Sequence, residues 1–263
     1  MSKLGMEEKV IKYSSFDGKE VEGFLVTGGN KAGIIVISEI WGITEYVRNV
    51  ARRLAGLGFT ALAPNLYSRD SEIFNERTIS SVMRRFFSLP PEKRGDREAL
   101  AKIVEGLTEQ EKRIYQDLVV NRASTEDRML KDLEHAFHYL KSLGLPKFGA
   151  IGFCMGGGLA FQLSTQVPLD ATVVYYGRNP RTLEDIAKIK GPVLAHYAGE
   201  DSAINQGVPD MVRAMIQYKK ELDMKIYPGT YHAFATEGGH VYNEAAAKDA
   251  WDRTVRFFTR VLG

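Results

Sequence analysis

One stretch of the chain decides the expected fold: Gly152-Phe153-Cys154-Met155-Gly156-Gly157-Gly158. The apolar run 148–151 precedes it, and the helix-forming run 159–163 follows it. A strand, a sharp turn and a helix in this order predict a nucleophile elbow, which raises one reactive side chain above the edge of a sheet. Glycines two positions on either side of the central residue allow the close backbone approach that such a turn requires.

The central residue of this stretch, Cys154, is the only cysteine of the chain. A thiol at a helix N-terminus lies near the positive end of the helix dipole, which favours the nucleophilic thiolate. An inert buried cysteine in a glycine-rich turn is the simpler alternative. The flanking pattern favours a nucleophile, and a single cysteine excludes an internal disulfide and is typical of a reducing compartment.

Two later segments supply the partners that a nucleophile needs. Asp201 follows the apolar run 193–197, and His232 follows the run 224–227. The histidine would accept the thiol proton, and the carboxylate would orient the imidazole through its other nitrogen. Nucleophile, acid and histidine in this chain order are expected after such an elbow. Surface-loop roles are the alternative for both residues, and Glu200 competes with Asp201 as the acid.

Alternating strand and helix patterns predict the architecture. Apolar, β-branched runs are typical of strands buried on both faces of a parallel sheet, and helical stripes lie between them. A hairpin around Asp17-Gly18 precedes the first of these runs. Expected strands are 8–13, 20–26, 33–38, 59–63, 148–151, 171–175, 193–197 and 224–227, and expected helices include 44–58, 124–143 and a last helix carrying Trp251, Val255, Phe258 and Leu262. The chain is therefore expected to form one α/β domain, residues 1–263, with a mostly parallel sheet covered by helices on both faces.

Residues 68–123 interrupt this alternation. The segment is charged and helix-forming, with expected helices over 71–88 and 92–120 and a break at Pro90-Pro91. Such a length is too great for a bare loop. We expect a helical insertion that caps the edge where open α/β sheets bind ligands, with a solvated helical excursion as the alternative.

Composition excludes several classes of partner. The formal net charge is only +2 without a basic block, so we expect no nucleic-acid partner. Met1-Ser2-Lys3-Leu4-Gly5 opens a charged segment without an apolar signal core, so we expect a cytoplasmic protein without a membrane anchor. No metal is expected, because His135 and His138 lack further ligands at metal-binding spacing. No cofactor is expected either, because neither a P-loop nor a dinucleotide fingerprint is present. His196 is expected to be structural, and His240 has no assigned role.

Four motifs resemble the dienelactone hydrolase family of α/β-hydrolases: 38–42 (SEIWG), 63–67 (APNLY), 152–157 (GFCMGG) and 231–234 (YHAF). The resemblance covers nearly the whole chain except 67–124. It implies that Cys154 is the nucleophile, His232 the base and Asp201 its orienting acid. It further implies that the backbone N–H groups of Ile40 and Met155 form the oxyanion hole.

Glu39 corresponds to the family glutamate that contacts the resting thiol. A salt bridge at the end of a strand is the alternative role for this residue.

The expected function is cofactor-free hydrolysis of lactones or carboxylic esters through a thioester on Cys154. The alternatives are a general carboxylesterase or thioesterase, and a binding or redox-sensing protein without turnover. The expected partner is a small-molecule ester or lactone, and the sequence leaves a homo-oligomer open.

The chain departs from the family at one substrate-binding position. The resemblance places an arginine four residues after the histidine, where this chain has Thr236. Threonine cannot supply a bidentate, charged clamp for a carboxylate. We therefore expect neutral substrates to be hydrolysed at least as well as anionic ones, with Trp41 and Phe234 carrying more of the recognition. Arg84 or Arg85 is the alternative source of a clamp.

Overall fold

The computed structural model describes residues 5–263; Met1–Leu4, which opened the segment without a signal core, lie outside the described residues. The strands are β1 (Glu7–Ser14), β2 (Glu20–Thr27), β3 (Gly33–Ile37), β4 (Thr60–Pro64), β5 (Phe148–Phe153), β6 (Ala171–Tyr175), β7 (Val193–Ala198) and β8 (Leu222–Tyr227). The helices are α1 (Glu45–Gly56), α2 (Glu76–Phe87), α3 (Arg97–Glu105), α4 (Glu109–Tyr115), α5 (Arg122–Ser142), α6 (Met155–Ser164), α7 (Ser202–Asn205), α8 (Val208–Gln217) and α9 (Glu244–Leu262).

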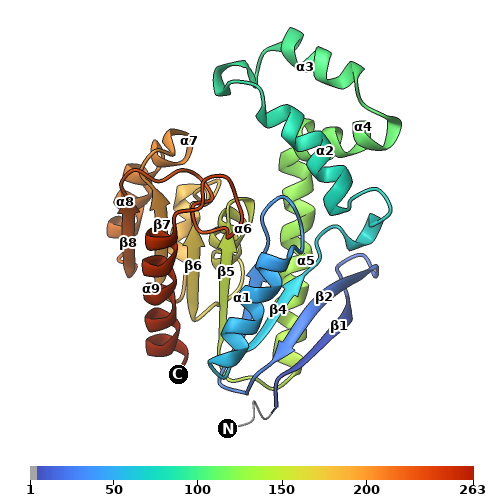
Figure 1. Ribbon diagram of the computed structural model, residues 1–263. Coiled ribbons are helices and arrows are strands. Elements are labelled where there is room, and N and C mark those ends of the chain that lie inside the picture. The colour runs from blue at the N-terminus through green and yellow to red at the C-terminus, as the bar shows by residue number, and fades with distance from the viewer. Residues whose placement is uncertain (1–4) are drawn as a thin grey trace.

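The strands form one sheet of eight in the order β1-β2-β4-β3-β5-β6-β7-β8 (Figure 1). β1 pairs antiparallel with β2, and β2 pairs antiparallel with β4. Every other neighbouring pair, from β4-β3 to β7-β8, is parallel. The predicted hairpin and the predicted, mostly parallel α/β sheet are therefore confirmed.

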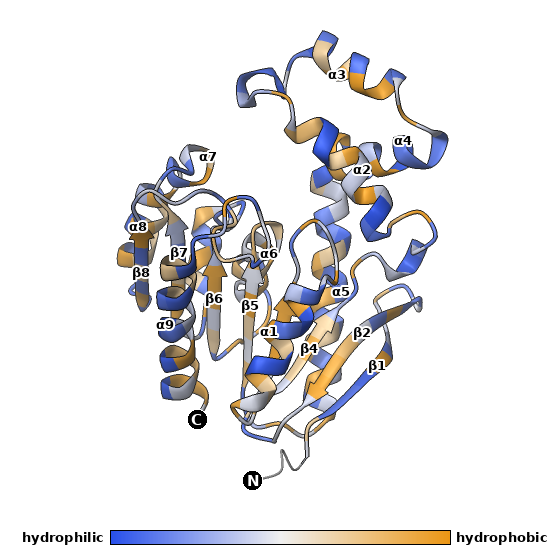
Figure 2. Ribbon diagram, viewed as in Figure 1, coloured by the Kyte–Doolittle hydropathy of each residue, from blue (hydrophilic) through white to orange (hydrophobic). Residues whose placement is uncertain are grey.

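Helices cover both faces of the sheet, because alternate side chains of the buried strands point in opposite directions. In β3, Ile34 and Val36 belong to the core on the side of α1 and α9. Ile35 and Ile37 belong to the core on the side of α5 and α6. The strands in the middle of the sheet are mainly apolar, whereas the edge strand β1 and much of the helical surface are hydrophilic (Figure 2). This layering is that of the α/β-hydrolase fold.

The segment between β4 and α5 is mostly helical. It contains α2, α3 and α4, short 3₁₀ turns at Ser68–Asp70 and Pro91–Lys93, and a π-helical turn at Gln116–Val120. The helix-forming stretch 92–120 contains two α-helices: α3 ends at Glu105 with Gly106 as its C-cap, and Thr108 begins α4 by accepting a hydrogen bond from the Glu111 N–H. In Figure 1 these helices lie beyond the upper end of the sheet, where the parallel strands end.

A buried ion pair anchors the start of this segment. Asp132 of α5 is fully buried and accepts hydrogen bonds from Arg69 at 2.6 and 3.0 Å, from Arg128 at 2.7 Å and from Ser15 at 2.6 Å. Arg69 also contacts Asp17 of the hairpin turn at 2.6 Å. Two guanidinium groups compensate the buried carboxylate, as a buried charge requires. The network fixes the root of the insertion on the sheet.

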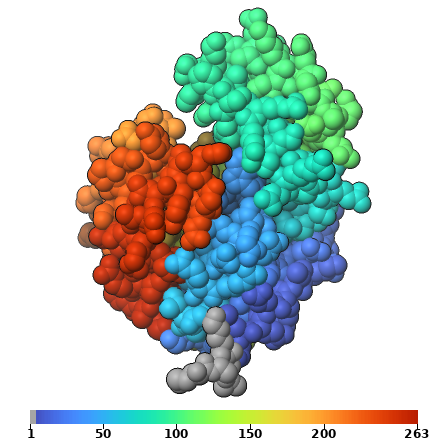
Figure 3. Space-filling model, in the orientation of Figure 1, coloured from blue at the N-terminus to red at the C-terminus, as the bar shows by residue number. Residues whose placement is uncertain are grey.

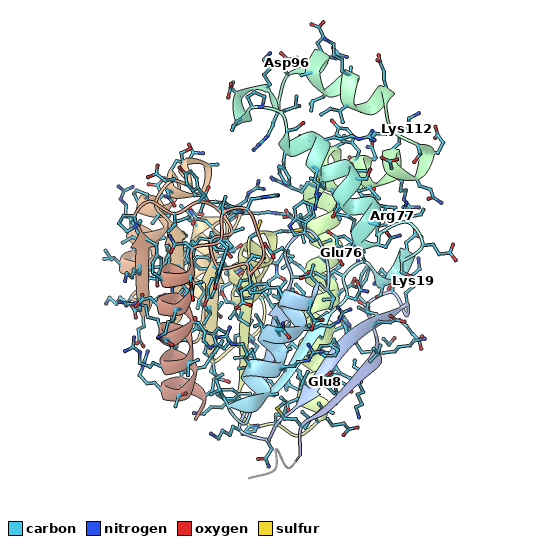
Figure 4. The ribbon with its side chains drawn as sticks, in the orientation of Figure 1. Glu8, Lys19, Glu76, Arg77, Asp96 and Lys112 are labelled. Carbon is cyan, nitrogen blue, oxygen red and sulfur yellow. The ribbon has the colours of Figure 1, made fainter. Side chains whose placement is uncertain are left out.

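Charged side chains cover the outside of the molecule. Asp96 and Lys112 are carried on the outer part of the insertion, and Glu8 lies on the hairpin (Figure 4). Within residues 5–263, no helix combines the length and the apolar character needed to cross a bilayer.

Candidate active site

Cys154 occupies the turn between β5 and α6. Its φ of 59° and ψ of −118° lie in the region that L-residues rarely adopt. Three backbone hydrogen bonds hold this conformation: the Cys154 N–H donates to the Tyr175 carbonyl at 3.0 Å, and the Cys154 carbonyl accepts from the N–H groups of Gly157 and Gly158. The predicted strand, turn and helix are therefore all present, and the surrounding structure maintains the strained residue between them.

The elbow glycines are required by close backbone packing. A Cβ atom on Gly152 would lie 1.8 Å from the Gly156 carbonyl oxygen. A Cβ atom on Gly156 would lie 2.3 Å from the Ile37 carbonyl oxygen. Because backbone atoms cannot move aside as a flexible side chain can, neither position accepts a larger residue without a shift of the elbow.

His232 lies between Cys154 and Asp201. Its Nε2 atom is 2.8 Å from the Cys154 Sγ atom, and its Nδ1 atom is 2.5 Å from the Asp201 Oδ2 atom. Asp201 is buried at the N-terminus of α7, where its other oxygen accepts a hydrogen bond from the Ile204 N–H at 3.4 Å. Glu200 is exposed to solvent. Of the two neighbouring acids, Asp201 is therefore the one that contacts the imidazole.

The surroundings of His232 favour its protonated form. Burial acts to lower the pKa of His232, but the negative charge of Cys154 and the hydrogen bonds to Asp201 and Cys154 raise it to about 10. The three side chains thus form a hydrogen-bonded chain, and the contacts with Asp201 and Cys154 favour a proton on the imidazole between them.

Glu39 lies in the loop after β3 and is 3% exposed. The Thr236 hydroxyl donates a hydrogen bond to its Oε2 atom at 3.1 Å, and its Oε1 atom has no partner within residues 5–263. Burial raises the pKa of Glu39 to about 7, against the opposing effects of the Thr236 hydrogen bond and the charge of His232. Among the described residues no cation forms an ion pair with this carboxyl, and its raised pKa allows it to hold or release a proton near neutral pH.

Ile40 and Met155, whose backbone N–H groups were expected to form the oxyanion hole, line the same cavity as Cys154. Met155 is the first residue of α6, so its N–H has no acceptor inside the helix. The Glu39–Ile40 peptide is held by the Gly42 N–H, which donates to the Glu39 carbonyl at 3.2 Å, and this fixes the direction of the Ile40 N–H. The Tyr67 hydroxyl donates to the Ile40 carbonyl at 2.7 Å. Ile40, Met155 and Cys154 all line one cavity.

This cavity has a volume of about 870 Å³ and lies between the sheet edge and the insertion. Figure 3 shows the surface hollowed between the helices of the insertion and the C-terminal part of the chain. Its wall is largely apolar, and Trp41 and Phe87 meet there edge to face with ring centroids 6.2 Å apart. The apolar wall comprises Ile40, Trp41, Met83, Phe86, Phe87, Leu118, Met129, Leu130, Met155, Leu159 and Ile204.

Three residues expected to bind substrate lie elsewhere. Phe234 is fully buried in the core, with its ring 5.0 Å from that of Tyr227, and its neighbour Ala233 lines the cavity instead. Arg84 and Arg85 are exposed on α2, and Arg85 donates to the Gly106 carbonyl at 2.8 Å. Neither arginine lines the cavity, because the inward face of α2 there carries Met83, Phe86 and Phe87.

Four arginines that line the cavity were not predicted from the sequence: Arg94, Arg122, Arg178 and Arg181. Arg178 carries the one available signal, since it follows the end of β6 and polar residues at that edge of a parallel sheet approach the ligand site. The other histidines lie outside the site. His196 is buried against Thr254, with the two side chains 3.1 Å apart. His135, His138 and His240 do not line the cavity.

Comparison with known proteins agrees with this geometry. The model of the dienelactone hydrolase family matches residues 21–262. The chain belongs to the dienelactone hydrolase family. It is 51% identical over 255 residues to a protein of Saccharolobus solfataricus named "Putative carboxymethylenebutenolidase", covering 97% of this chain and 99% of that one. The predicted family is confirmed.

Solved structures of lower identity share the fold. A dienelactone hydrolase of Anabaena variabilis superposes with a TM-score of 0.64 at 17% identity, over 98% of this chain and 99% of that one. A Klebsiella pneumoniae structure titled as a "Putative Dienelactone Hydrolase" has a TM-score of 0.70 at 24% identity, over 97% and 99% of the two chains. The chain thus has both the sequence and the fold of this hydrolase family.

Proposed function

We propose that the protein hydrolyses carboxylic esters or lactones through a thioester on Cys154. The observation that carries this proposal is the position of His232, whose two ring nitrogens contact the Cys154 sulfur and the Asp201 carboxylate. A nucleophile, a base and a group that orients the base are the three parts that acyl transfer requires.

In the first half of the reaction, the Cys154 sulfur attacks the carbonyl carbon of the substrate. The N–H groups of Ile40 and Met155 bind the oxygen on which negative charge develops. His232 then gives its proton to the leaving alkoxide or enolate as the C–O bond breaks, and the acyl group remains on Cys154 as a thioester. Asp201 stabilises the imidazolium while it holds this proton.

In the second half, a water molecule attacks the thioester. His232 takes a proton from the water and returns it to the sulfur as the C–S bond breaks, which releases the acid. Glu39 lines the same cavity, and its Oε1 atom has no partner in residues 5–263, so when the next substrate enters Glu39 can take the thiol proton and pass it to His232, which restores the thiolate and the imidazolium. Side chains perform each of these proton transfers, so the proposed reaction needs no cofactor.

A panel of three substrates tests the proposal: an aryl ester such as p-nitrophenyl hexanoate, the lactone dihydrocoumarin, and an aryl thioester. Wild-type protein should turn over the ester or the lactone, and Cys154→Ala should lose this activity while its circular dichroism spectrum stays unchanged. Cys154→Ser should also lose most of the turnover, because a hydroxyl is far harder to deprotonate than a thiol.

The rates on the three substrates distinguish the alternatives. Faster lactone than ester hydrolysis supports a lactonase, and preference for the thioester supports a thioesterase. Absence of turnover on every substrate by wild-type protein would support a binding or redox-sensing protein instead.

A further inference from the structure

The strand β8 forms one edge of the sheet, far from the cavity wall of the insertion. It is the last strand in the sheet order, so it has a neighbouring strand, β7, on one side only (Figure 1). The carbonyl oxygens of Glu221 and Tyr227 accept hydrogen bonds from the N–H groups of Val193 and Gly199, at 3.0 and 2.9 Å. Because backbone groups in a strand alternate in direction, the odd-numbered residues of β8 face β7 and the even-numbered residues face outward.

The outward-facing residues of this edge are Leu222, Met224 and Ile226. Their backbone N–H and C=O groups make no hydrogen bond to another element within residues 5–263. A row of such groups is a template for pairing with a further strand. The next even-numbered residue, Pro228, has no N–H, so a ladder formed on this edge ends at Ile226.

The outward-facing residues also have apolar side chains. Leu222 and Met224 pack in part against the core beneath α8, and Ile226 is 49% exposed. Ile216, near the end of α8, is 73% exposed. The Lys220 N–H donates to the Met215 carbonyl at 2.9 Å, which holds the end of α8 beside the start of β8. The α8 side of this edge therefore exposes an apolar side chain near each end of the strand.

The opposite side of the same edge carries two unlike charges, Asp223 and Lys225. Asp223 is exposed, and the half-buried Lys225 places its Nζ atom 3.0 Å from an oxygen of Asp249 on α9. A lysine in the middle of an edge strand normally opposes pairing with another strand. An aspartate directly opposite this lysine would turn that repulsion into an attraction.

We propose that β8 pairs antiparallel with β8 of a second copy of this chain, about a twofold axis through Met224. Leu222 of each copy then lies opposite Ile226 of the other, and these pairs and the two Met224 residues exchange backbone hydrogen bonds. Asp223 of each copy lies opposite Lys225 of the other, in the closely spaced pairs between them. Such an interface uses the same surface on both subunits, so it closes with two copies.

The charges select this register among the possible ones. A twofold axis through residue 223 or residue 225 would place identical charges opposite each other, which is destabilising. An axis through residue 222 or residue 226 shortens the ladder, and the first of these places Asp223 opposite Glu221. The axis through Met224 is the one that pairs unlike charges and also matches the apolar ends of the strand.

Two charge variants test the register. Asp223→Lys places a second cation opposite Lys225, and Lys225→Glu places a second anion opposite Asp223. Wild-type protein should form a dimer of twice the monomer mass of 29.4 kDa in sedimentation equilibrium. Each variant alone should raise the dissociation constant of this dimer about tenfold or more. An equimolar mixture of the two variants should form dimers again, because every charge then meets its opposite.

Glu20→Lys is the matched control. Glu20 lies on β2, toward the other end of the sheet, and its side chain is 68% exposed. The substitution changes the net charge as Asp223→Lys does, yet the dissociation constant should stay within about twofold of wild type, because exposed charges at a distance are screened by salt. Circular dichroism spectra like that of wild type would show that each variant is folded.

Three results would overturn the proposal. The first is a wild-type monomer at every protein concentration. The second is a dimer that persists unchanged in Asp223→Lys and Lys225→Glu, which would place the interface on another surface. The third is a pair of folded variants that dissociate alone and do not dimerise when mixed.

Hydrogen exchange of the wild-type protein provides a second measurement if a variant does not fold. The amide protons of Leu222, Met224 and Ile226 should exchange more slowly at high than at low protein concentration, because pairing protects them. The other edge strand, β1, should exchange at the same rate at both concentrations. Exchange in β8 that does not depend on protein concentration contradicts the proposal.

Discussion

The Nε2 atom of His232 lies 2.8 Å from the Sγ atom of Cys154, although 78 positions separate the two residues in the chain. The contact joins the loop after β8 to the elbow after β5, across the C-terminal ends of the parallel strands. Adjacent strand ends bring distant residues together without long connecting loops, and the proposed chemistry depends on this geometry.

Asp201 and its neighbour Glu200 provide a matched pair of variants. Asp201→Asn removes the charge that orients and stabilises the imidazolium, so kcat should fall by roughly 10²-fold or more. Glu200→Gln should leave kcat within about twofold of wild type, because this side chain is exposed and an isosteric surface change alters little. Equal losses in the two variants, measured as steady-state ester hydrolysis, would remove Asp201 from the mechanism.

His232 should make stability depend on pH in the alkaline range. Its folded-state pKa is raised from 6.5 to about 10, so the folded protein binds a proton that the unfolded chain has released. This contribution is fully present below pH 6.5 and is lost as pH rises toward 10. Between pH 6.5 and 10, the melting temperature of wild type should therefore fall relative to that of His232→Gln. A constant difference across this range would show that the imidazole pKa is not raised.

Glu39 should make the folded protein less stable as pH rises, whereas an ion-paired carboxylate would make it more stable. Burial raises its pKa from 4.5 to about 7, so the folded protein becomes less stable as pH rises between these values. Glu39→Gln removes this penalty. In urea unfolding, the free energy of unfolding of the variant should rise relative to that of wild type by up to about 3 kcal/mol between pH 4.5 and pH 8. Glu72→Gln, at an exposed position of the insertion, is the control and should show no such gain. The same outcome for both variants would contradict burial of a carboxyl at position 39.

The elbow should not accept a methyl group at Gly156. The added Cβ atom would lie 2.3 Å from the Ile37 carbonyl oxygen, so Gly156→Ala should destabilise the fold by roughly 2–4 kcal/mol in urea unfolding. Gly56→Ala is the control, because nothing lies within 4 Å of a Cβ atom at this position in the last turn of α1. That variant should be neutral or slightly more stable, since alanine favours helix. Two equally stable variants would refute the close packing of the elbow.

Much of the fold follows from local patterns. The elbow could be predicted because its glycines, apolar strand and helix lie within a short stretch around Cys154. The parallel strands could be predicted because burial on both faces leaves continuous apolar runs such as 33–37. The break between α3 and α4 was not predicted, since its signals, Gly106 and Thr108, are single residues within a charged, helix-forming segment.

The wall of the cavity could not be predicted in the same way. Phe234 was expected to bind substrate because it lies two positions after His232, but its side chain is buried beside Tyr227 and Tyr176. Arg84 and Arg85 lie on the exposed side of α2. The sequence does not show which side of this helix faces the cavity, because that depends on how the whole insertion packs on the sheet. Arg94, Arg122 and Arg181 line the cavity because of how the insertion, α5 and the loop after β6 are placed, and no local pattern marks them.

The central claim is that the acyl group of the substrate is carried on the Cys154 sulfur. Rapid acid quenching of wild-type protein during p-nitrophenyl hexanoate turnover, followed by mass spectrometry, tests it most directly. We expect one hexanoyl group on the peptide that contains Cys154; neutral hydroxylamine should remove it, as expected for a thioester, and it should be absent from Cys154→Ala. A hexanoyl group on another residue, or continued turnover by Cys154→Ala, would contradict the account.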